Sequence, residues 1–168
     1  QADQMLYQVR RFGQKMAVAY SMTQDSKTSG EQAKCLTLLE SAERIFYDRL
    51  DDAIRSASMF DETEYKAFCQ GSISFGNKEE AQKKKEIYNG IVSTVDKVVH
   101  DNERLILRLD SLAYALNQRS AQNPWDTEVV LAMSKLDAVI NKTTQDIEQD
   151  EVISREAMKQ YDILKGES

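Results

Sequence analysis

The stretch that decides the fold is residues 87–116, IYNGIVSTVDKVVHDNERLILRLDSLAYAL. Its aliphatic residues recur at alternating steps of four and three, and one member of the series is polar. The series is Ile87, Ile91, Val95, Val98, Asn102, Leu105, Leu109, Leu112 and Leu116. Because an α-helix has about 3.6 residues per turn, this spacing places the series on one narrow stripe along a helix. Such a stripe is typical of helices that pack lengthwise against other helices.

Three further segments carry apolar residues at helical spacing. We expect four long helices at about 3–22, 30–57, 78–118 and 124–165, joined in the middle by a connector, 58–77, that holds a short helix or a loop. The expected starts carry capping residues: Ser29 with Gln32, Asp61 with Glu64, Asn77 with Glu80, and Pro124 at a first helical position. No low-complexity tract divides the chain, so we expect one helical-bundle domain over residues 1–168.

Short turns make consecutive helices antiparallel, and this allows a test of how the stripes match. The last two long helices pair Leu116 with Val129, Leu112 with Met133, Leu109 with Leu136, Leu105 with Ile140, and Asn102 with Thr143. The first two pair Ala19 with Leu36, Met16 with Leu39, Val9 with Phe46, and Met5 with Leu50. Two matched hairpins predict an all-α fold, an elongated antiparallel, up-down four-helix bundle with coiled-coil-like packing.

The polar layer of Asn102 and Thr143 interrupts the apolar stripe. We interpret it as a buried pair that specifies register, and the alternative is a polar contact in a ligand site inside the bundle. Beyond this layer Asp150 and Ser154 fall on the stripe, so the last helix either shifts phase or opens to water there. Arg104 and Arg108 stand one turn apart nearby. They flank the stripe and bridge to acids, or they bind a carboxylate. These residues form a candidate ligand or assembly region: Arg104, Arg108, Asp150 and Ser154.

Four aromatic residues lie in the connector: Phe60, Tyr65, Phe68 and Phe75. Aromatic side chains at the end of a bundle usually close the open end of its core. An exposed hydrophobic tip would instead mark a binding surface. These four residues are therefore the candidates for contact with a partner.

The residue types needed for common enzyme mechanisms are missing. His100 is the single histidine, whereas a di-iron bundle needs a Glu-x-x-His motif on each of two helices. Cys35 and Cys69 are too far apart in sequence to form a zinc motif with it, and no Gly-rich phosphate loop occurs. We therefore expect no enzyme activity, no catalytic residues, no metal and no cofactor.

Charge and hydropathy narrow the choice of partners. The formal net charge is −6, which disfavours nucleic acid and anionic membranes because both bind clustered cations. No apolar run is long enough to span a bilayer. Cys35 and Cys69 are expected on either side of a long helix, too far apart for a disulfide unless the connector folds back, so we favour free thiols over a bridge. The chain begins at Gln1 without a Met, and we interpret it as a fragment or a processed protein, with an exported location favoured over the cytoplasm.

Two function hypotheses follow from these observations. The first is a non-catalytic helical-bundle module for protein–protein interaction or structure, acting on a protein partner or by self-association. The second is a four-helix ligand-sensing domain of a membrane receptor, outside the cytoplasm, that binds a small ligand. The sequence names neither the partner nor the ligand, because antiparallel bundles host many unrelated activities.

Overall fold

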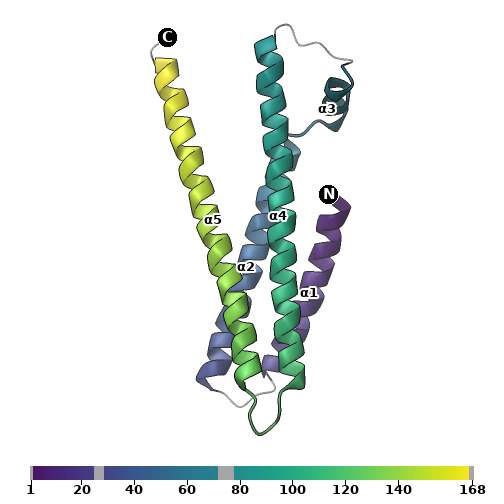
Figure 1. Ribbon diagram of the computed structural model, residues 1–168, viewed down its shortest axis with the longest axis vertical. Coiled ribbons are helices and arrows are strands. Elements are labelled where there is room, and N and C mark those ends of the chain that lie inside the picture. Colours follow the sequence, from purple (N-terminus) through teal and green to yellow (C-terminus); the bar gives the residue numbers. More distant parts are fainter. Residues whose placement is uncertain (1, 25–28, 72–77, 167–168) are drawn as a thin grey trace.

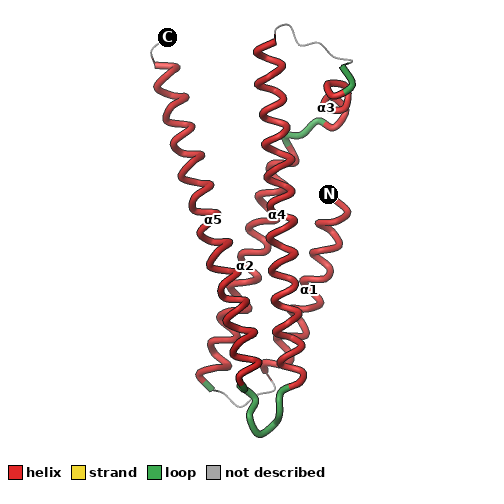
Figure 2. The backbone as a smooth tube through the Cα atoms, in the orientation of Figure 1, coloured by secondary structure: helices red, strands yellow, loops and turns green. Residues whose placement is uncertain are grey.

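The computed structural model describes residues 2–24, 29–71 and 78–166, and for residues 78, 80, 151 and 153–166 it describes the backbone alone. Within these ranges the chain is all-helical, without strands (Figure 2). Five helices follow one another: α1 (Ala2–Gln24), α2 (Gly30–Ser58), α3 (Glu62–Cys69), α4 (Lys78–Gln118) and α5 (Thr127–Gly166).

The four long helices lie lengthwise beside one another (Figure 1). Consecutive long helices run in opposite directions, so α1 is antiparallel to α2 and α4 is antiparallel to α5. Helix α4 packs against α1, α2 and α5, and α2 packs against α1, α4 and α5. As a result α1 and α4 are neighbours that run in the same direction, and so are α2 and α5 (Figure 1). These parallel contacts join the two hairpins together with the antiparallel contact of α2 with α4.

The stripe on α4 is buried along most of its length. Its members from Leu105 to Leu116 join one large core with residues of the other long helices, including Phe12, Phe46 and Leu136. The expectation for Ile87 is wrong, because this side chain is 60% exposed while the adjacent Tyr88 is 4% exposed. The reason is that Tyr65 of α3 and Phe60, two residues before this helix begins, contact the ring of Tyr88.

The α4–α5 hairpin buries the four residues of α5 that are predicted to pair with the α4 stripe between Leu105 and Leu116. Val129, Met133, Leu136 and Ile140 of α5 all belong to the main core. The predicted register of the first hairpin is wrong by three residues, close to one helical turn. Two contacts between α1 and α2 show the observed register: Phe12 stacks on Phe46 with ring centroids 3.9 Å apart, and Thr23 Oγ1 lies 3.6 Å from Cys35 Sγ.

Aromatic stacking and polar contacts near the turn explain this shift. The two rings stack nearly parallel in the core. Such an aromatic pair stabilises the fold by more than the burial of its apolar area alone would give. At the other end of the hairpin Gln32 Nε2 donates a hydrogen bond of 2.9 Å to the carbonyl of Thr23. Leu36 and Leu50, which the predicted register places at the interface, are half-buried.

Two predicted caps are confirmed and one helix start is wrong. Ser29 accepts a hydrogen bond from the amide of Gln32, and Asp61 accepts one from the amide of Glu64. Helix α5 begins at Thr127 and not at residue 124. The side chain of Asp126 accepts a hydrogen bond of 3.0 Å from the amide of Val129, so this aspartate is the cap and the residues before it form the turn.

The turn between α4 and α5 is held by its aromatic residue. Trp125 packs against the main core, and the guanidinium of Arg119 lies 5.6 Å from the centre of its ring.

The two cysteines are free thiols, with Cys35 buried in the core and Cys69 exposed at the end of α3. Burial raises the pKa of the Cys35 thiol more than the hydrogen bond with Thr23 lowers it.

Candidate functional site

A buried polar layer crosses all four long helices. It consists of Gln8 on α1, Arg49 on α2, Asp101 and Asn102 on α4, and Thr143 on α5, each at most 4% exposed. On one side of it lies the main core, and on the other side lies a small cluster: Ala53, Val95, Val98 and Val99. Polar groups in such a position need partners, because a buried unpaired donor or acceptor costs stability.

Helix α2 is joined to α4 by a buried ion pair in this layer. Arg49 Nη2 lies 2.8 Å from Asp101 Oδ2, and the two side chains are 4% and 6% exposed. The other terminal nitrogen of Arg49 is 3.9 Å from Asp52 Oδ2, one turn away on the same helix. The charge of the buried guanidinium is therefore balanced within the protein.

Helix α1 is joined to α4 at the same level. Gln8 Nε2 donates hydrogen bonds of 2.8 Å to the carbonyl of Val99 and 3.2 Å to Glu103 Oε2. Arg11 Nη1 lies 2.7 Å from Glu103 Oε1. Burial raises the pKa of Glu103, but the hydrogen bonds and charge of Arg11 and Gln8 outweigh this effect, and the net pKa is lowered.

The residues predicted to pair in this layer are both buried, but each meets a different environment. The hydroxyl of Thr143 donates to the carbonyl of Val139 on its own helix, at 2.9 Å. Among the described residues, neither the amide nitrogen nor the carbonyl oxygen of the Asn102 side chain has a hydrogen-bond partner. Gln8 Oε1 and Arg49 Nε are likewise unpartnered within that part of the chain. Buried groups of this kind commonly bind water or a polar ligand.

The candidate ligand or assembly region is only partly brought together. Arg104 and Arg108 are half-buried, one turn apart on α4. Asp150, a stripe position at which we expect α5 to shift phase or to open to water, is exposed and pairs with Lys97 Nζ at 2.7 Å. The side chain of Ser154 lies outside the described residues.

Helix α3 of the connector lies beside α4 (Figure 1). Phe60 and Tyr65 contact the ring of Tyr88, with centroids 5.2 Å and 5.5 Å apart, and contact each other at 5.1 Å. Phe68 is half-buried on α3, and Phe75 lies outside the described residues. The described aromatic residues therefore pack α3 against α4.

A shared carboxylate fixes this contact. Glu64 on α3 accepts hydrogen bonds from Tyr88 Oη and Lys84 Nζ on α4. The bond to Glu64 raises the pKa of Tyr88 to about 12. Hydrogen bonds from Lys84 and then Tyr88 lower the pKa of Glu64. The aromatic contact and the ionic contact thus act on the same turn of α4.

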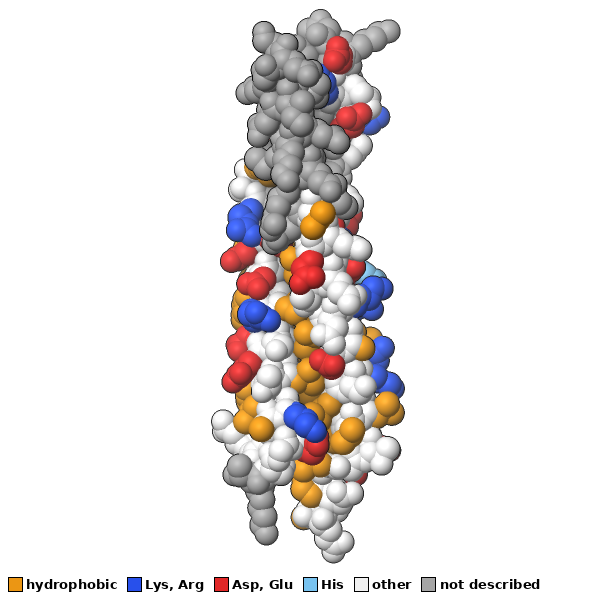
Figure 3. All heavy atoms as spheres, turned by 90° about the vertical axis from the view of Figure 1, so that its left-hand side faces the viewer, with side chains coloured by type: hydrophobic (Ala, Val, Ile, Leu, Met, Phe, Trp, Pro, Cys, Tyr) orange, Lys and Arg blue, Asp and Glu red, His pale blue; other side chains and the backbone are white. Residues whose placement is uncertain are grey.

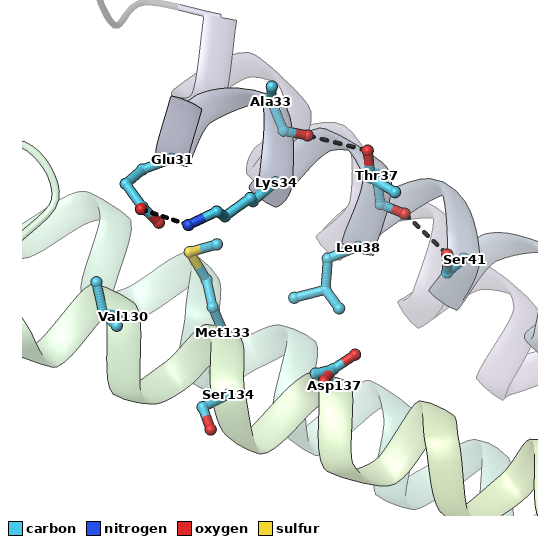
Figure 4. A pocket seen from close by; sticks show the side chains of 10 residues that line it. All are labelled: Glu31, Ala33, Lys34, Thr37, Leu38, Ser41, Val130, Met133, Ser134 and Asp137. Atoms are coloured by element: carbon cyan, nitrogen blue, oxygen red, sulfur yellow. Dashed lines mark hydrogen bonds and ion pairs between the residues drawn. The ribbon is translucent and has the colours of Figure 1, made fainter. Parts of the chain in front are cut away.

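A surface groove between α2 and α5 was not anticipated from the sequence. It has a volume of about 630 Å³, and Figure 4 shows Leu38 of α2 pointing toward α5 with Met133 across from it. We call it the α2/α5 groove, and its lining is Glu31, Ala33, Lys34, Thr37, Leu38, Ser41, Val130, Met133, Ser134 and Asp137. The signal that could have revealed it is the run Val129-Val130-Leu131-Ala132-Met133, which is longer than one buried stripe requires.

The face of the molecule that α5 presents carries hydrophobic side chains in a lengthwise band (Figure 3). Acidic and basic side chains stand on both sides of this band. Two residues from the apolar run of α5 remain open to solvent, since Val130 is 44% and Leu131 is 52% exposed. Apolar surface with a charged rim is typical of interaction sites.

Neither metal sites nor membrane spans are found in the part of the chain that the structure describes. No group of three or more metal-ligating side chains occurs there, and no helix of that part is long and apolar enough to cross a bilayer. Comparison of the chain with protein-family models, with curated proteins and with solved structures gives no match.

Proposed function

We propose that the chain is an up-down four-helix bundle with coiled-coil-like packing that serves as a non-catalytic interaction module. Its binding surface is the α2/α5 groove, which receives a helix of a protein partner. The antiparallel hairpins and the shared core support the bundle. The groove, with an apolar floor between two long helices, is the observation that carries the function.

The groove has the chemistry of a helix-binding surface. Leu38, Val130 and Met133 supply an apolar floor. The hydroxyls of Thr37 and Ser41 donate to carbonyls of their own helix, at 3.0 Å and 2.9 Å, so they do not require water. An amphipathic helix that covers such a floor gains the free energy of apolar burial without breaking these bonds.

Polar contacts hold one wall of the groove in place. Helix α2 is joined to α4 by Arg49 and Asp101, and α4 is joined to α1 by the contacts of Gln8 and Arg11. A wall that keeps its position before binding loses little conformational entropy when a partner docks.

A photo-crosslinking experiment tests this function. p-Benzoylphenylalanine replaces Ser134, an exposed residue of the groove, and in the control it replaces Ala138, which is exposed on α5 outside the groove. A partner that crosslinks only from position 134 is purified, and its affinity is measured by calorimetry. We expect Ser134→Arg to weaken binding by about tenfold or more and Ala138→Arg to leave it unchanged. Equal crosslinking from both positions would contradict the proposal.

The polar layer favours a second candidate function, a ligand-sensing domain of a membrane receptor outside the cytoplasm. The observation that favours this function is that the Asn102 side chain is fully buried and has no hydrogen-bond partner among the described residues. A thermal-shift screen with small acids and amines tests it. Stabilisation that disappears in Asn102→Leu would support sensing, and a lack of stabilisation across the panel would reject it.

A further inference from the structure

The outward surface of α4 carries an apolar ridge that the bundle does not cover. Leu107 is 56% exposed and Tyr114 is 67% exposed, and Ser111 lies between them. Arg104 and Arg108 stand beside these residues on the same helix. We call these five residues the α4 ridge.

We propose that the α4 ridge of a second copy of this chain occupies the α2/α5 groove. This inference rests on the proposed function, since it names the partner of the same groove. A second copy suits the groove because its ridge matches the groove in length, is complementary to it in charge and lies near the same level along the bundle.

The lengths match. Leu107 and Tyr114 are seven residues apart, as are Val130 and Asp137 at the two ends of the groove on α5. Seven residues of an α-helix rise roughly 10 Å, so two turns of ridge fit two turns of groove. The ridge supplies two large apolar side chains, and the groove supplies the apolar floor of Leu38, Val130 and Met133.

The charges are complementary. In the part of the chain that the structure describes, neither Arg104 nor Arg108 takes part in an ion pair, although both are half-buried. At the groove the carboxylate of Asp137 accepts a hydrogen bond of 3.2 Å from Asn141 Nδ2 and has no cationic partner among the described residues. Arginine suits such a carboxylate because its guanidinium donates two parallel hydrogen bonds.

The positions along the bundle agree as well. The ion pair of Lys97 and Asp150 sets which turns of α4 and α5 are level. Counting along both helices from this pair, Arg108 is level with the turn that holds Asp137, and Tyr114 is level with Met133. A second copy placed alongside without sliding therefore brings its Arg108 to the carboxylate and its tyrosine to the apolar floor.

Ridge and groove lie on different surfaces of one chain, so each copy can use both at once. The ridge is on the outward side of α4, and the groove is between α2 and α5. A contact between two different surfaces is heterologous, and it continues from copy to copy into rings or filaments. We therefore expect the mass in solution to rise with concentration.

Light scattering and sedimentation of the full chain test this inference. The ridge variant is Leu107→Ser with Tyr114→Ser, the groove variant is Ser134→Arg, and the matched control is Ala138→Arg. All four positions are exposed, so the fold should tolerate these changes. We expect wild type and control to assemble and each variant to remain monomeric.

Mixing the two variants gives the sharpest outcome. The ridge variant keeps an intact groove and the groove variant keeps an intact ridge, so together they should form a dimer that grows no further. Charge reversal provides a second readout, in which Arg108→Asp or Asp137→Arg alone weakens assembly and both changes in one chain restore it. A wild type that stays monomeric at every concentration, or variants that assemble like it, would overturn the inference.

The crosslinking experiment separates this inference from the proposed function. Crosslinks from position 134 to a second copy at Leu107 or Tyr114 support both. Crosslinks from position 134 to a different protein retain the interaction module and reject the second copy as its partner. Absence of a specific crosslink rejects both.

Discussion

Arg49 Nη2 and Asp101 Oδ2 lie 2.8 Å apart in the interior, where α2 crosses the level of the polar layer on α4. Together with the contacts of Gln8 and Arg11, this ion pair joins both α1 and α2 to α4. Within the described part of the chain, the ion pair between α4 and α5 is the exposed one of Lys97 and Asp150. Exposed pairs contribute little, so α5 is held mainly by apolar contacts.

Removing one partner of the buried pair should strongly destabilise the protein. Asp101→Ala leaves the guanidinium of Arg49 buried without its main counter-ion, and we expect a loss of about 3–5 kcal/mol in the free energy of unfolding. Replacing both residues by leucine should cost less, since no unpaired charge remains. Urea unfolding followed by circular dichroism measures both. A double variant as unstable as Asp101→Ala would contradict this account.

Asn102→Leu should stabilise the chain. The asparagine amide is fully buried and unpartnered among the described residues, and its replacement by an apolar side chain of similar size should add about 1–3 kcal/mol. Thermal unfolding measures the change. As a control, Thr143→Val removes a hydroxyl that bonds within its own helix, and we expect little effect. A large loss of stability in Asn102→Leu would show that the amide binds a group that leucine cannot hold.

A disulfide can report the register of the first hairpin. Thr23→Cys, made with Cys69→Ser, should form a bridge with Cys35, because the two side chains meet across α1 and α2. Tyr20→Cys is the control, since the register predicted from sequence places residue 20 opposite Cys35. Mass spectrometry after oxidation detects the loss of two hydrogen atoms. A bridge in the control but not in Thr23→Cys would favour the predicted register.

The contact between α3 and α4 should weaken at alkaline pH. The bond to Glu64 raises the pKa of Tyr88 to about 12, above the value near 10 of a free tyrosine. Above pH ~10 the unfolded chain loses this proton while the folded chain retains it, so the contact weakens as pH rises toward 12. Glu64→Gln should lower the Tyr88 pKa. NMR titration of labelled tyrosines, with Tyr88→Phe for assignment, measures it.

Acid should remove the contribution of Glu103 to the free energy of unfolding. Burial raises the pKa of Glu103, but Arg11 and Gln8 lower it by a larger amount. The pKa in the folded chain therefore lies below the value in the unfolded chain, which is about 4.3. The stabilisation is therefore complete above pH ~4.3 and is lost as pH falls through the folded pKa. We expect the stability difference between wild type and Glu103→Gln to shrink in acid. A stability difference that does not change as the pH falls would contradict this account.

The sequence predicts much of the helical structure because its signals are local. Helix α4 spans the expected residues, Lys78–Gln118, and the caps at Ser29 and Asp61 form as expected. The start of α5 was misplaced because Pro124 suits a helix start, whereas Asp126 provides the cap that forms. Both signals were present, and the competition between neighbouring residues decided the outcome.

The candidate sites were harder to predict, since each depends on several helices. Asn102 and Thr143 were predicted to be buried from the stripes alone, but the Arg49–Asp101 pair joins residues 52 positions apart. The stripe of α5 predicts a phase shift or an opening to water at Asp150, but it does not indicate that this exposed residue pairs with Lys97. The α2/α5 groove is formed by two helices from different hairpins, and no local pattern shows that they are neighbours.

The sequence by itself determined the all-α class, most of the helix bounds, and most of the stripe residues that α4 and α5 bury. These follow from 3.6-residue periodicity and from capping within a few residues, which act before any distant contact forms. Only the tertiary structure decided that α1 lies beside α4 and α2 beside α5, that Phe12 stacks on Phe46, and that a groove stays open. Those outcomes depend on how side chains far apart in the chain fit together, a property that local spacing does not contain.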